Sequence, residues 1–222
     1  MKKIIRQTGL LFLKVFYPRL YFIEKNNAEV GHLVKNIARS QISENVKIAG
    51  PCQIGNCEFS DYTYIGSNAV ISLTKIGKFC SIGPNFFCGY GIHPTNGLST
   101  SPAFYSNKNQ CGISFSTENK IDENLPITIG NDVFIGMNVT VLDGITIGDG
   151  AIIGAGAIVS KDIPPYAIAV GAPIKIIKYR FDQTTIDELL KIKWWDFETE
   201  KLKDVEACFF DYQQFIDKYK TL

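Results

Sequence analysis

The stretch 127–164 reads ITIGNDVFIGMNVTVLDGITIGDGAIIGAGAIVSKDIP, and its periodicity decides the fold. An aliphatic residue recurs at every sixth position, namely at Ile129, Ile135, Val141, Ile147, Ile153 and Val159. This period is neither that of an amphipathic helix nor the two-residue alternation of a half-buried strand. It is typical of a parallel β-helix, in which the repeated aliphatic side chain points into the coil. Because one coil cannot bury its own interior, we expect the coils to stack.

Glycine follows four of these six aliphatic residues, at Gly130, Gly136, Gly148 and Gly154. A residue without a Cβ lets the chain turn a corner without a clash. The same phase begins at Ile42 and continues, with short slips, as far as Cys88. Because three hexapeptides close one triangular coil, the pattern predicts an all-β solenoid of about five to six coils. We place this domain at residues 42–180.

Residues 89–126 interrupt the repeat with GYGIHPTNGLSTSPAFYSNKNQCGISFSTENKIDENLP, which has no sixfold order. A long irregular insertion in a compact repeat domain is either functional or disordered. Four aromatic residues argue against disorder, namely Tyr90, Phe104, Tyr105 and Phe115. We therefore expect an ordered loop that projects from one corner of the coil.

Charge and composition exclude several classes of function. The net charge is +1, without the basic stripe that nucleic-acid binding usually requires. The chain has six cysteines but no CxxC pair, and its two histidines, His32 and His93, lie far apart. These spacings match no zinc site, so we predict no metal and free cysteines in a reducing cytoplasm. Cys88 has the inward phase of the repeat, which makes it a poor nucleophile.

The N-terminal segment 1–41 contains a basic, apolar and aromatic stretch, MKKIIRQTGLLFLKVFYPRLYFI, at residues 1–23. Its uncharged runs are too short for a spanning helix, and no small-residue cleavage site follows. Two interpretations remain. The segment either caps the end of the coil stack or lies on the inner face of an anionic membrane as an interfacial helix. We favour the cap, because every repeat fold needs one.

The C-terminal tail, residues 181–222, has helical periodicity. Thr185 and Glu188 have the spacing of a capping box at the start of a first helix. A second amphipathic helix is predicted from apolar residues at three- and four-residue steps, namely Leu202, Val205, Phe209, Tyr212, Phe215 and Tyr219. We expect this tail to cover one side of the coil.

His93 is the candidate catalytic residue, because it lies at the base of the loop directly after the last in-phase hexapeptide. Imidazole groups titrate at about pH 6.5, which suits a general base at neutral pH. A rigid scaffold beside an adaptable loop is a common setting for an active site. No Ser-His-Asp or Cys-His-Asn spacing is present.

Several segments together resemble the left-handed β-helix acyltransferases. They are the hexapeptide coil, the loop GIHPTNGLSTSPAFYS, the segment IGNDVFIG, the run IGAGAIVSKDIPPYAIAVGAPIKIIKYRF and the tail IDELLKIKWWDF. More narrowly, the chain is similar to the xenobiotic acetyltransferase group and to its relatives that O-acetylate bacterial surface polysaccharides. The resemblance implies a left-handed coil, a homotrimer with active sites between subunits, and acetyl-CoA as acyl donor.

The resemblance also implies the site residues. His93 matches the catalytic histidine of the family, which takes the proton from the acceptor hydroxyl. Gly136 and Met137 stand where the family places the thioester end of acetyl-CoA. The positions that match the pantetheine and phosphate path are Ala155, Ser160, Lys161, Lys175 and Lys178. One departure concerns Phe134, because the family often has tryptophan there.

The leading hypothesis is an acetyl-CoA-dependent O-acetyltransferase that acts on a sugar hydroxyl of a surface polysaccharide or its precursor. The amino-acid sequence of the loop and the basic, apolar N-terminal segment favour this hypothesis. Alternative acceptors are antibiotics of the chloramphenicol or streptogramin type and nucleotide amino-sugars, the latter by N-acetylation. A non-catalytic β-helix scaffold is the alternative from another class.

Overall fold

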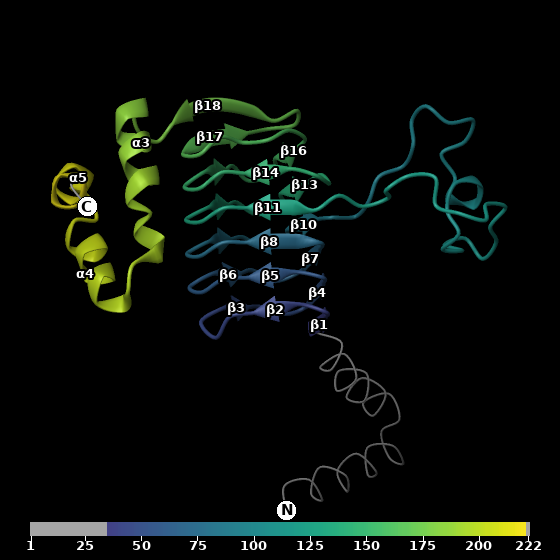
Figure 1. Cartoon of the computed structure of the whole chain (residues 1–222), viewed down its shortest axis with the longest axis horizontal. Coiled ribbons are helices and arrows are strands. Elements are labelled where there is room, and N and C mark those ends of the chain that lie inside the picture. Colours follow the sequence, from purple (N-terminus) through teal and green to yellow (C-terminus); the bar gives the residue numbers. More distant parts are fainter. Residues whose placement is uncertain (1–34, 221–222) are drawn as a thin grey trace, which may run out of the picture.

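A computed structural model describes residues 35–220 and shows a three-sided parallel β-helix with helices on one side and a long loop on the other (Figure 1). Sheet A contains β1 (Lys35–Ala38), β4 (Cys52–Gly55), β7 (Ala69–Ser72), β10 (Phe87–Cys88), β13 (Thr140–Val141) and β16 (Ile158–Val159). Sheet B contains β2 (Gln41–Ile42), β5 (Glu58–Phe59), β8 (Thr74–Ile76), β11 (Ile127–Ile129) and β14 (Thr146–Ile147). Sheet C contains β3 (Lys47–Ile48), β6 (Tyr64–Ile65), β9 (Ser81–Ile82), β12 (Phe134–Ile135), β15 (Ile152–Ile153), β17 (Ala167–Val170) and β18 (Lys175–Tyr179).

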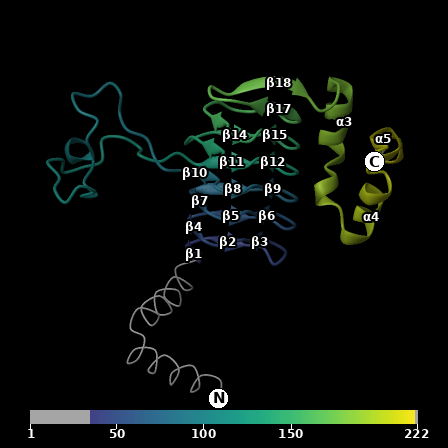
Figure 2. The same cartoon turned by 180° about the vertical axis from the view of Figure 1, so that it is seen from behind.

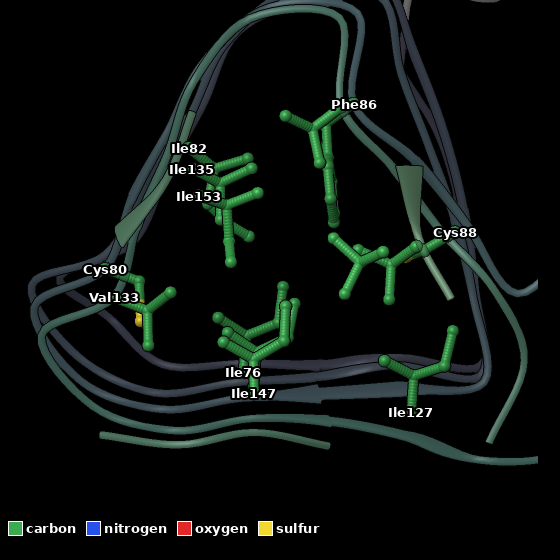
Figure 3. Close-up of a cluster of buried hydrophobic side chains, with 14 of the residues drawn as sticks. Ile76, Cys80, Ile82, Phe86, Cys88, Ile127, Val133, Ile135, Ile147 and Ile153 are labelled. Carbon is green, nitrogen blue, oxygen red and sulfur yellow. The ribbon is translucent and has the colours of Figure 1, made fainter. Parts of the chain in front are cut away.

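The register of the sheets confirms the sixfold phase. Ile135 pairs with Ile82 of the coil before it and with Ile153 of the coil after it. These three side chains stack in a row inside the triangle (Figure 3). All six repeat aliphatics of the stretch 127–164 are at most 1% exposed, so one aliphatic side chain per face builds the core. The predicted parallel β-helix is therefore confirmed.

The coil begins earlier than the sequence pattern suggested. β1 pairs with β4 from Lys35↔Cys52 to Ala38↔Gly55, so the first described coil starts before Ile42. Asn36 stands on the sixfold phase, six residues before Ile42, but is polar, and the aliphatic Ile37 is one residue off that phase, which is why the start was missed. Among residues 35–220, sheet A has six strands, in agreement with the predicted number of coils. The predicted N-terminal cap or membrane helix at residues 1–23 lies outside the described residues.

The three corners of the triangle are named after the sheets that they join. The A–B corner carries loop 89–126, which leaves the stack after β10 and returns at β11. The B–C corner includes residues 77–80, 130–133 and 148–151, and the C–A corner includes residues 83–86, 136–139 and 154–157. This division decides which predicted site residues lie together.

The repeat glycines serve close stacking of coils rather than the turn itself. A Cβ on Gly136 would lie 2.6 Å from the backbone nitrogen of Ala155 in the next coil. The left-handed backbone that turns the C–A corner belongs instead to Asn85 (φ 57°), Asn138 (φ 58°) and, one coil further, Gly156 (φ 72°), which is not one of the four repeat glycines. Asparagine tolerates this conformation, and the Asn85 amide donates to Asn138 Oδ1 over 2.8 Å. The corner is therefore built by both residue types for different reasons.

The C-terminal tail packs as helices against the B–C corner, on the side away from the loop (Figure 2). The helices are α3 (Gln183–Ile192), α4 (Thr199–Ala207) and α5 (Tyr212–Tyr219). The rings of Phe79 and Trp194 lie 5.0 Å apart, and Lys78 Nζ contacts Asp196 Oδ1 at 2.9 Å. These contacts hold the tail to the coil.

Two details of the predicted tail were wrong. Asp182, not Thr185, caps α3, because its carboxylate accepts from the Thr185 backbone N–H at 2.8 Å. The single second helix is in fact two helices, since Asp211 starts a new one by accepting from Gln214 N–H at 3.0 Å. Both errors have the same physical cause, because an aspartate carboxylate satisfies free N–H groups at a helix start. Within residues 35–220, no helix is long and apolar enough to cross a membrane.

Candidate active site

The loop that carries His93 is anchored at its stem by one carboxylate of the coil. Asp143, at the A–B corner of the following coil, accepts from the Gly91 N–H at 3.0 Å and from the Leu125 N–H at 3.2 Å. The two chain segments of the stem also contact each other directly, since Ile92 N–H donates to Glu123 O over 2.8 Å. Both ends of the loop are therefore fixed to the rigid scaffold. One of the fixed residues, Gly91, lies only two positions before His93.

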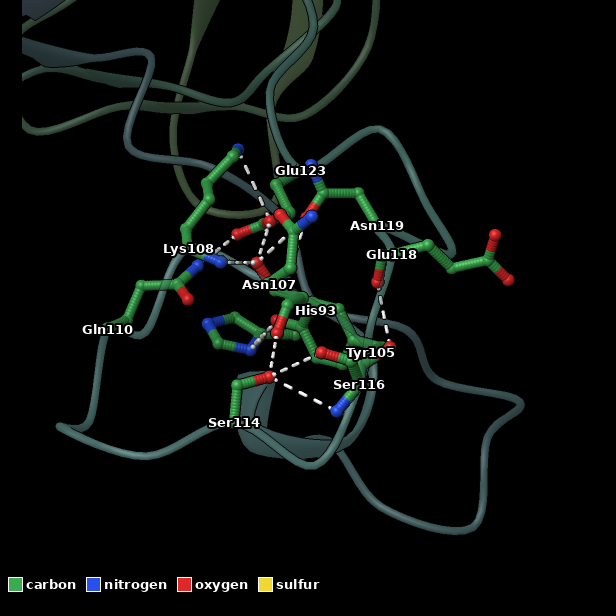
Figure 4. A network of polar contacts seen from close by, with 11 residues as sticks. His93, Tyr105, Asn107, Lys108, Gln110, Ser114, Ser116, Glu118, Asn119 and Glu123 are labelled. Carbon is green, nitrogen blue, oxygen red and sulfur yellow. Dashed lines mark hydrogen bonds and ion pairs between the residues drawn. The ribbon is translucent and has the colours of Figure 1, made fainter.

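His93 is exposed, and its ring is oriented by two contacts at the same nitrogen (Figure 4). Nδ1 lies 2.8 Å from the carbonyl oxygen of Thr100 and 2.8 Å from the hydroxyl of Tyr105. A carbonyl oxygen can only accept, so the Thr100 contact requires a proton on Nδ1. The Tyr105 oxygen can accept from the same N–H. The tautomer that satisfies both contacts leaves Nε2 with a free lone pair, as a general base requires.

Tyr105 combines a buried ring with a placed hydroxyl. The residue is 5% exposed, and its ring meets the imidazole edge-on with centroids 6.1 Å apart. Burial, followed by the nearby Glu123 carboxylate, raises the pKa of Tyr105. The hydroxyl consequently keeps its proton at neutral pH and acts as a neutral partner of the imidazole.

Glu123 ties together the outer part of the loop. Its carboxylate accepts from Ser106 Oγ at 2.6 Å and from Gln110 Nε2 at 2.5 Å, and Lys108 Nζ lies 3.2 Å away. The Ser106 hydrogen bond is the main cause that lowers the pKa of Glu123, against the opposing effect of burial. Figure 4 shows this network beside His93 and Tyr105. The prediction of an ordered loop is in keeping with these contacts.

Three of the residues expected near acetyl-CoA lie together at the C–A corner. Gly136 is buried, and Met137, which follows it, is 48% exposed. Ala155 lies directly over Gly136 in the next coil, and Gly156 N–H donates to Met137 O at 2.9 Å. The chain here has bare backbone and small side chains, so a thin molecule can approach the coil closely.

The other residues expected to contact acetyl-CoA lie at the A–B corner and along β18. Ser160 and Lys161 follow β16 and lie at the A–B corner, exposed to solvent. In β18, Lys175 pairs with Val170 near the C–A corner, whereas Lys178 pairs with Ile168 at the other end of the strand. The two lysines therefore do not form a compact pair within one chain.

His93 and the C–A corner are separated within one chain. Sheet A lies between their two corners, a span of roughly 15 Å at about 3.3 Å per residue. The loop also projects away from the coil (Figures 1 and 2). One chain by itself therefore does not bring His93 to Gly136.

Sequence reasoning missed the residues that hold the histidine. Thr100, Tyr105 and Asp143 lie 7, 12 and 50 positions from His93 in the sequence. The carbonyl of Thr100 carries no side-chain signal at all. Asp143 follows the inward Val141 in the repeat, and its place beside the loop stem becomes visible only when the coils are stacked.

Comparisons with known proteins agree with this fold. Residues 126–161 match the family described as Bacterial transferase hexapeptide (six repeats). A probable macrolide acetyltransferase from Lysinibacillus sphaericus is 40% identical over 149 residues, which are 64% of this chain and 77% of that protein. A chloramphenicol acetyltransferase from Agrobacterium fabrum (strain C58 / ATCC 33970) is 42% identical over 134 residues, 58% of this chain and 62% of that protein. The match to this chloramphenicol acetyltransferase thus spans less than two thirds of that protein's length.

A solved maltose O-acetyltransferase from Clostridium difficile 630 is 26% identical and covers 72% of this chain and 76% of its own. Its TM-score is 0.36. The sequence relatives and the repeat match define the chain as an acyltransferase built on a hexapeptide β-helix. It belongs to the family of hexapeptide-repeat acetyltransferases.

Proposed function

We propose that this protein transfers the acetyl group of acetyl-CoA directly to a hydroxyl group, with His93 as general base. One observation carries the proposal: Nδ1 of His93 is engaged by Thr100 O and the Tyr105 hydroxyl, and the tautomer that fits both contacts keeps the lone pair on Nε2. Nε2 takes the proton of the acceptor hydroxyl while that oxygen forms a bond to the thioester carbonyl carbon. When the tetrahedral intermediate collapses, the C–S bond breaks and the proton passes to the leaving thiolate.

For the donor, we propose the bare edge at Gly136, Met137 and Ala155 as the place of the thioester end. Backbone N–H groups of coil corners can donate to the oxyanion of the intermediate. Lys161 and Lys175 are exposed cations on either side of sheet A, which supports a role near the phosphates. Ser160 and Lys178 would complete this path.

The proposal includes a homotrimer, as the family resemblance implies, because His93 and the proposed place of the thioester lie apart in one chain. Loop 89–126 projects outward from the A–B corner, while the residues proposed here as the donor edge, Gly136, Met137 and Ala155, lie at the C–A corner. A neighbouring copy supplies the missing half if its donor edge faces this loop. An exposed apolar strip on sheet A supports such a contact, with Phe87 39% and Ile158 43% exposed.

Complementation between two inactive variants tests this arrangement. His93→Ala removes the base, and Met137→Trp places a large ring on the donor edge. Oligomers that contain both variants should regain part of the acetyl transfer that each variant lacks, because some sites then combine two intact halves. If mixed oligomers form and stay as inactive as either parent, the site lies within one chain.

For the acceptor, we propose a sugar hydroxyl of a bacterial surface polysaccharide or its precursor, as the loop sequence suggests. A second candidate is an antibiotic hydroxyl, which the names of the macrolide and chloramphenicol relatives favour. A thiol-release assay separates them when it compares polysaccharide fragments, macrolides, chloramphenicol, streptogramins and nucleotide amino-sugars. Acetylation of antibiotics alone would contradict the polysaccharide proposal.

The role of His93 is tested by His93→Ala. We expect acetyl transfer to fall by about a hundredfold or more, in the range that general bases contribute, while acetyl-CoA still binds. Calorimetric titration with acetyl-CoA provides the folding and donor-site control. Retained full activity would exclude His93 as the base.

A further inference from the structure

One end of the coil stack has no cover among residues 35–220. The first described coil is formed by β1, β2 and β3, and each of these strands is the last one of its sheet (Figure 1). Within the described part of the chain they pair on one side only, with β4, β5 and β6. The free backbone N–H and C=O groups of such edge strands invite pairing with another chain segment.

The open end is also apolar. The inward side chains of the first coil belong to Ile37, Ile42 and Ile48. Ile42 is 39% exposed, whereas its register partner in the second coil, Phe59, is 3% exposed. Ile37 and Ile48 are half-buried, although their register partners in the second coil are buried. Covering the three isoleucines would remove apolar surface from water, which is favourable.

The opposite end of the stack is covered by the chain itself. β18 folds back antiparallel on β17. Ile174, in the turn between these strands, is 3% exposed, and Ile176 of β18 packs against the core. Because a solenoid needs a cap at each end, the first coil requires an equivalent cover.

The chain segment that leads into this end has the composition and the reach to cover it. Residues 10–23, LLFLKVFYPRLYFI, carry two charges among fourteen residues. Residues 24–34 connect this stretch to Lys35, the first residue of β1. A connection of this length reaches at most about 36 Å, and fourteen residues span about 21 Å as a helix. One hexapeptide side of the triangle measures about 20 Å, so the stretch is long enough to cross the open face.

We propose that residues 10–23 dock on the open end of the stack and cover Ile37, Ile42 and Ile48. The tether favours this occupant over a membrane or a second copy of the chain, because a short connection gives an effective concentration of about millimolar. The docked stretch also shields the edges of β1, β2 and β3, so that two stacks do not pair end to end. The inference is independent of the proposed reaction.

Thiol labelling of the full chain tests the proposal. Ile42→Cys places a thiol under the proposed contact, and Lys47→Cys is the matched control, because Lys47 is an exposed residue of the same coil. We expect iodoacetamide to label position 42 about tenfold or more slowly than position 47, because the contact must open before the thiol reacts. The natural Cys111 is exposed and serves as the internal reference.

A further variant removes the occupant. Leu10→Ser, Leu11→Ser and Leu13→Ser together make the stretch more polar. They should raise the labelling rate at position 42 to that at position 47 and leave the rate at position 47 unchanged.

Four results would overturn the proposal. Equal labelling rates at positions 42 and 47 in the chain with an unmodified N-terminal stretch would show an uncovered end. Protection that is lost when the protein is diluted would indicate a second copy as the occupant. Protection that requires vesicles of phosphatidylserine and phosphatidylcholine would indicate a membrane. Protection that persists after the three serine substitutions would show that the stretch is not the cover.

Hydrogen exchange covers the case in which Ile42→Cys does not fold. Without an introduced cysteine, the backbone amides of residues 41–48 should exchange faster after the three serine substitutions, because their cover is lost. The amides of residues 146–153, in the middle of the stack, should exchange at the same rate in both proteins. Equal exchange of residues 41–48 in the two proteins would contradict the proposal.

Discussion

Removal of the Tyr105 hydroxyl is the sharpest test of how His93, the proposed general base, is held. In Tyr105→Phe, the buried ring stays in place against the imidazole, and only the atom 2.8 Å from His93 Nδ1 is lost. The remaining contact is the one to Thr100 O, also at 2.8 Å. We therefore expect a histidine that is still oriented, but less firmly.

The expected magnitude follows from the number of bonds lost. One neutral hydrogen bond contributes about 0.5–1.5 kcal/mol, and about 1.4 kcal/mol corresponds to a tenfold change in rate. If the whole contribution is felt in the transition state, kcat/KM falls by roughly two- to twelvefold. This effect is much smaller than the loss of the base itself, for which about a hundredfold or more is expected.

The assay is release of the CoA thiol at a fixed acceptor concentration, measured over a pH series. Tyr90→Phe is the matched control, because Tyr90 belongs to the same loop and the residue is 67% exposed. We expect Tyr90→Phe to keep the rate of the unmodified protein. Tyr105→Phe should lower kcat and alter the pH profile of kcat/KM, while the affinity for acetyl-CoA stays the same.

Two results would refute the reasoning. An unchanged kcat in Tyr105→Phe would show that the hydroxyl does not orient the imidazole during the reaction. A loss as large as that of His93→Ala would show that Tyr105 takes part in the chemistry rather than in positioning.

Two further predictions concern the scaffold. Gly136→Ala should lower the melting temperature clearly, because its Cβ would lie 2.6 Å from the Ala155 nitrogen. Gly55→Ala should be tolerated, since nothing lies within 4 Å of its Cβ. Thermal unfolding measures both variants, and equal melting temperatures of the two would contradict the role of Gly136 in the stacking of coils. In the folded protein at pH 8, iodoacetamide should label the exposed Cys111 and not Cys88, because burial raises the pKa of the Cys88 thiol to about 12. Mass spectrometry locates the label, and rapid labelling of Cys88 would disprove its place in the core.

Much of the fold could be predicted from periodicity alone. The inward phase assigned to Ile135, Ile147 and Ile153 is confirmed by their complete burial. Local repetition suffices here, because each coil contacts only the coils before and after it. The helix boundaries of the tail were predicted less well, since Asp182 and Asp211 act through single hydrogen bonds that a periodic pattern does not reveal.

The candidate site, too, could be predicted from the sequence only in part. His93 could be singled out because it follows the last repeat before the loop, and its catalytic role stays a proposal. The contacts that orient it could not be predicted, because a backbone carbonyl and a tyrosine come together only through the path of an irregular loop.

The sequence by itself determined the sixfold coil, its buried face, the place of the loop and the membership in a family of acetyltransferases. Only the tertiary structure decided that loop 89–126, the edge at Gly136 and the C-terminal helices occupy three different corners. The reason is geometric. The repeat predicts which side chains point into the coil, but the three-sided winding decides which side of the molecule each corner occupies. For that reason His93 and Gly136 lie apart in one chain.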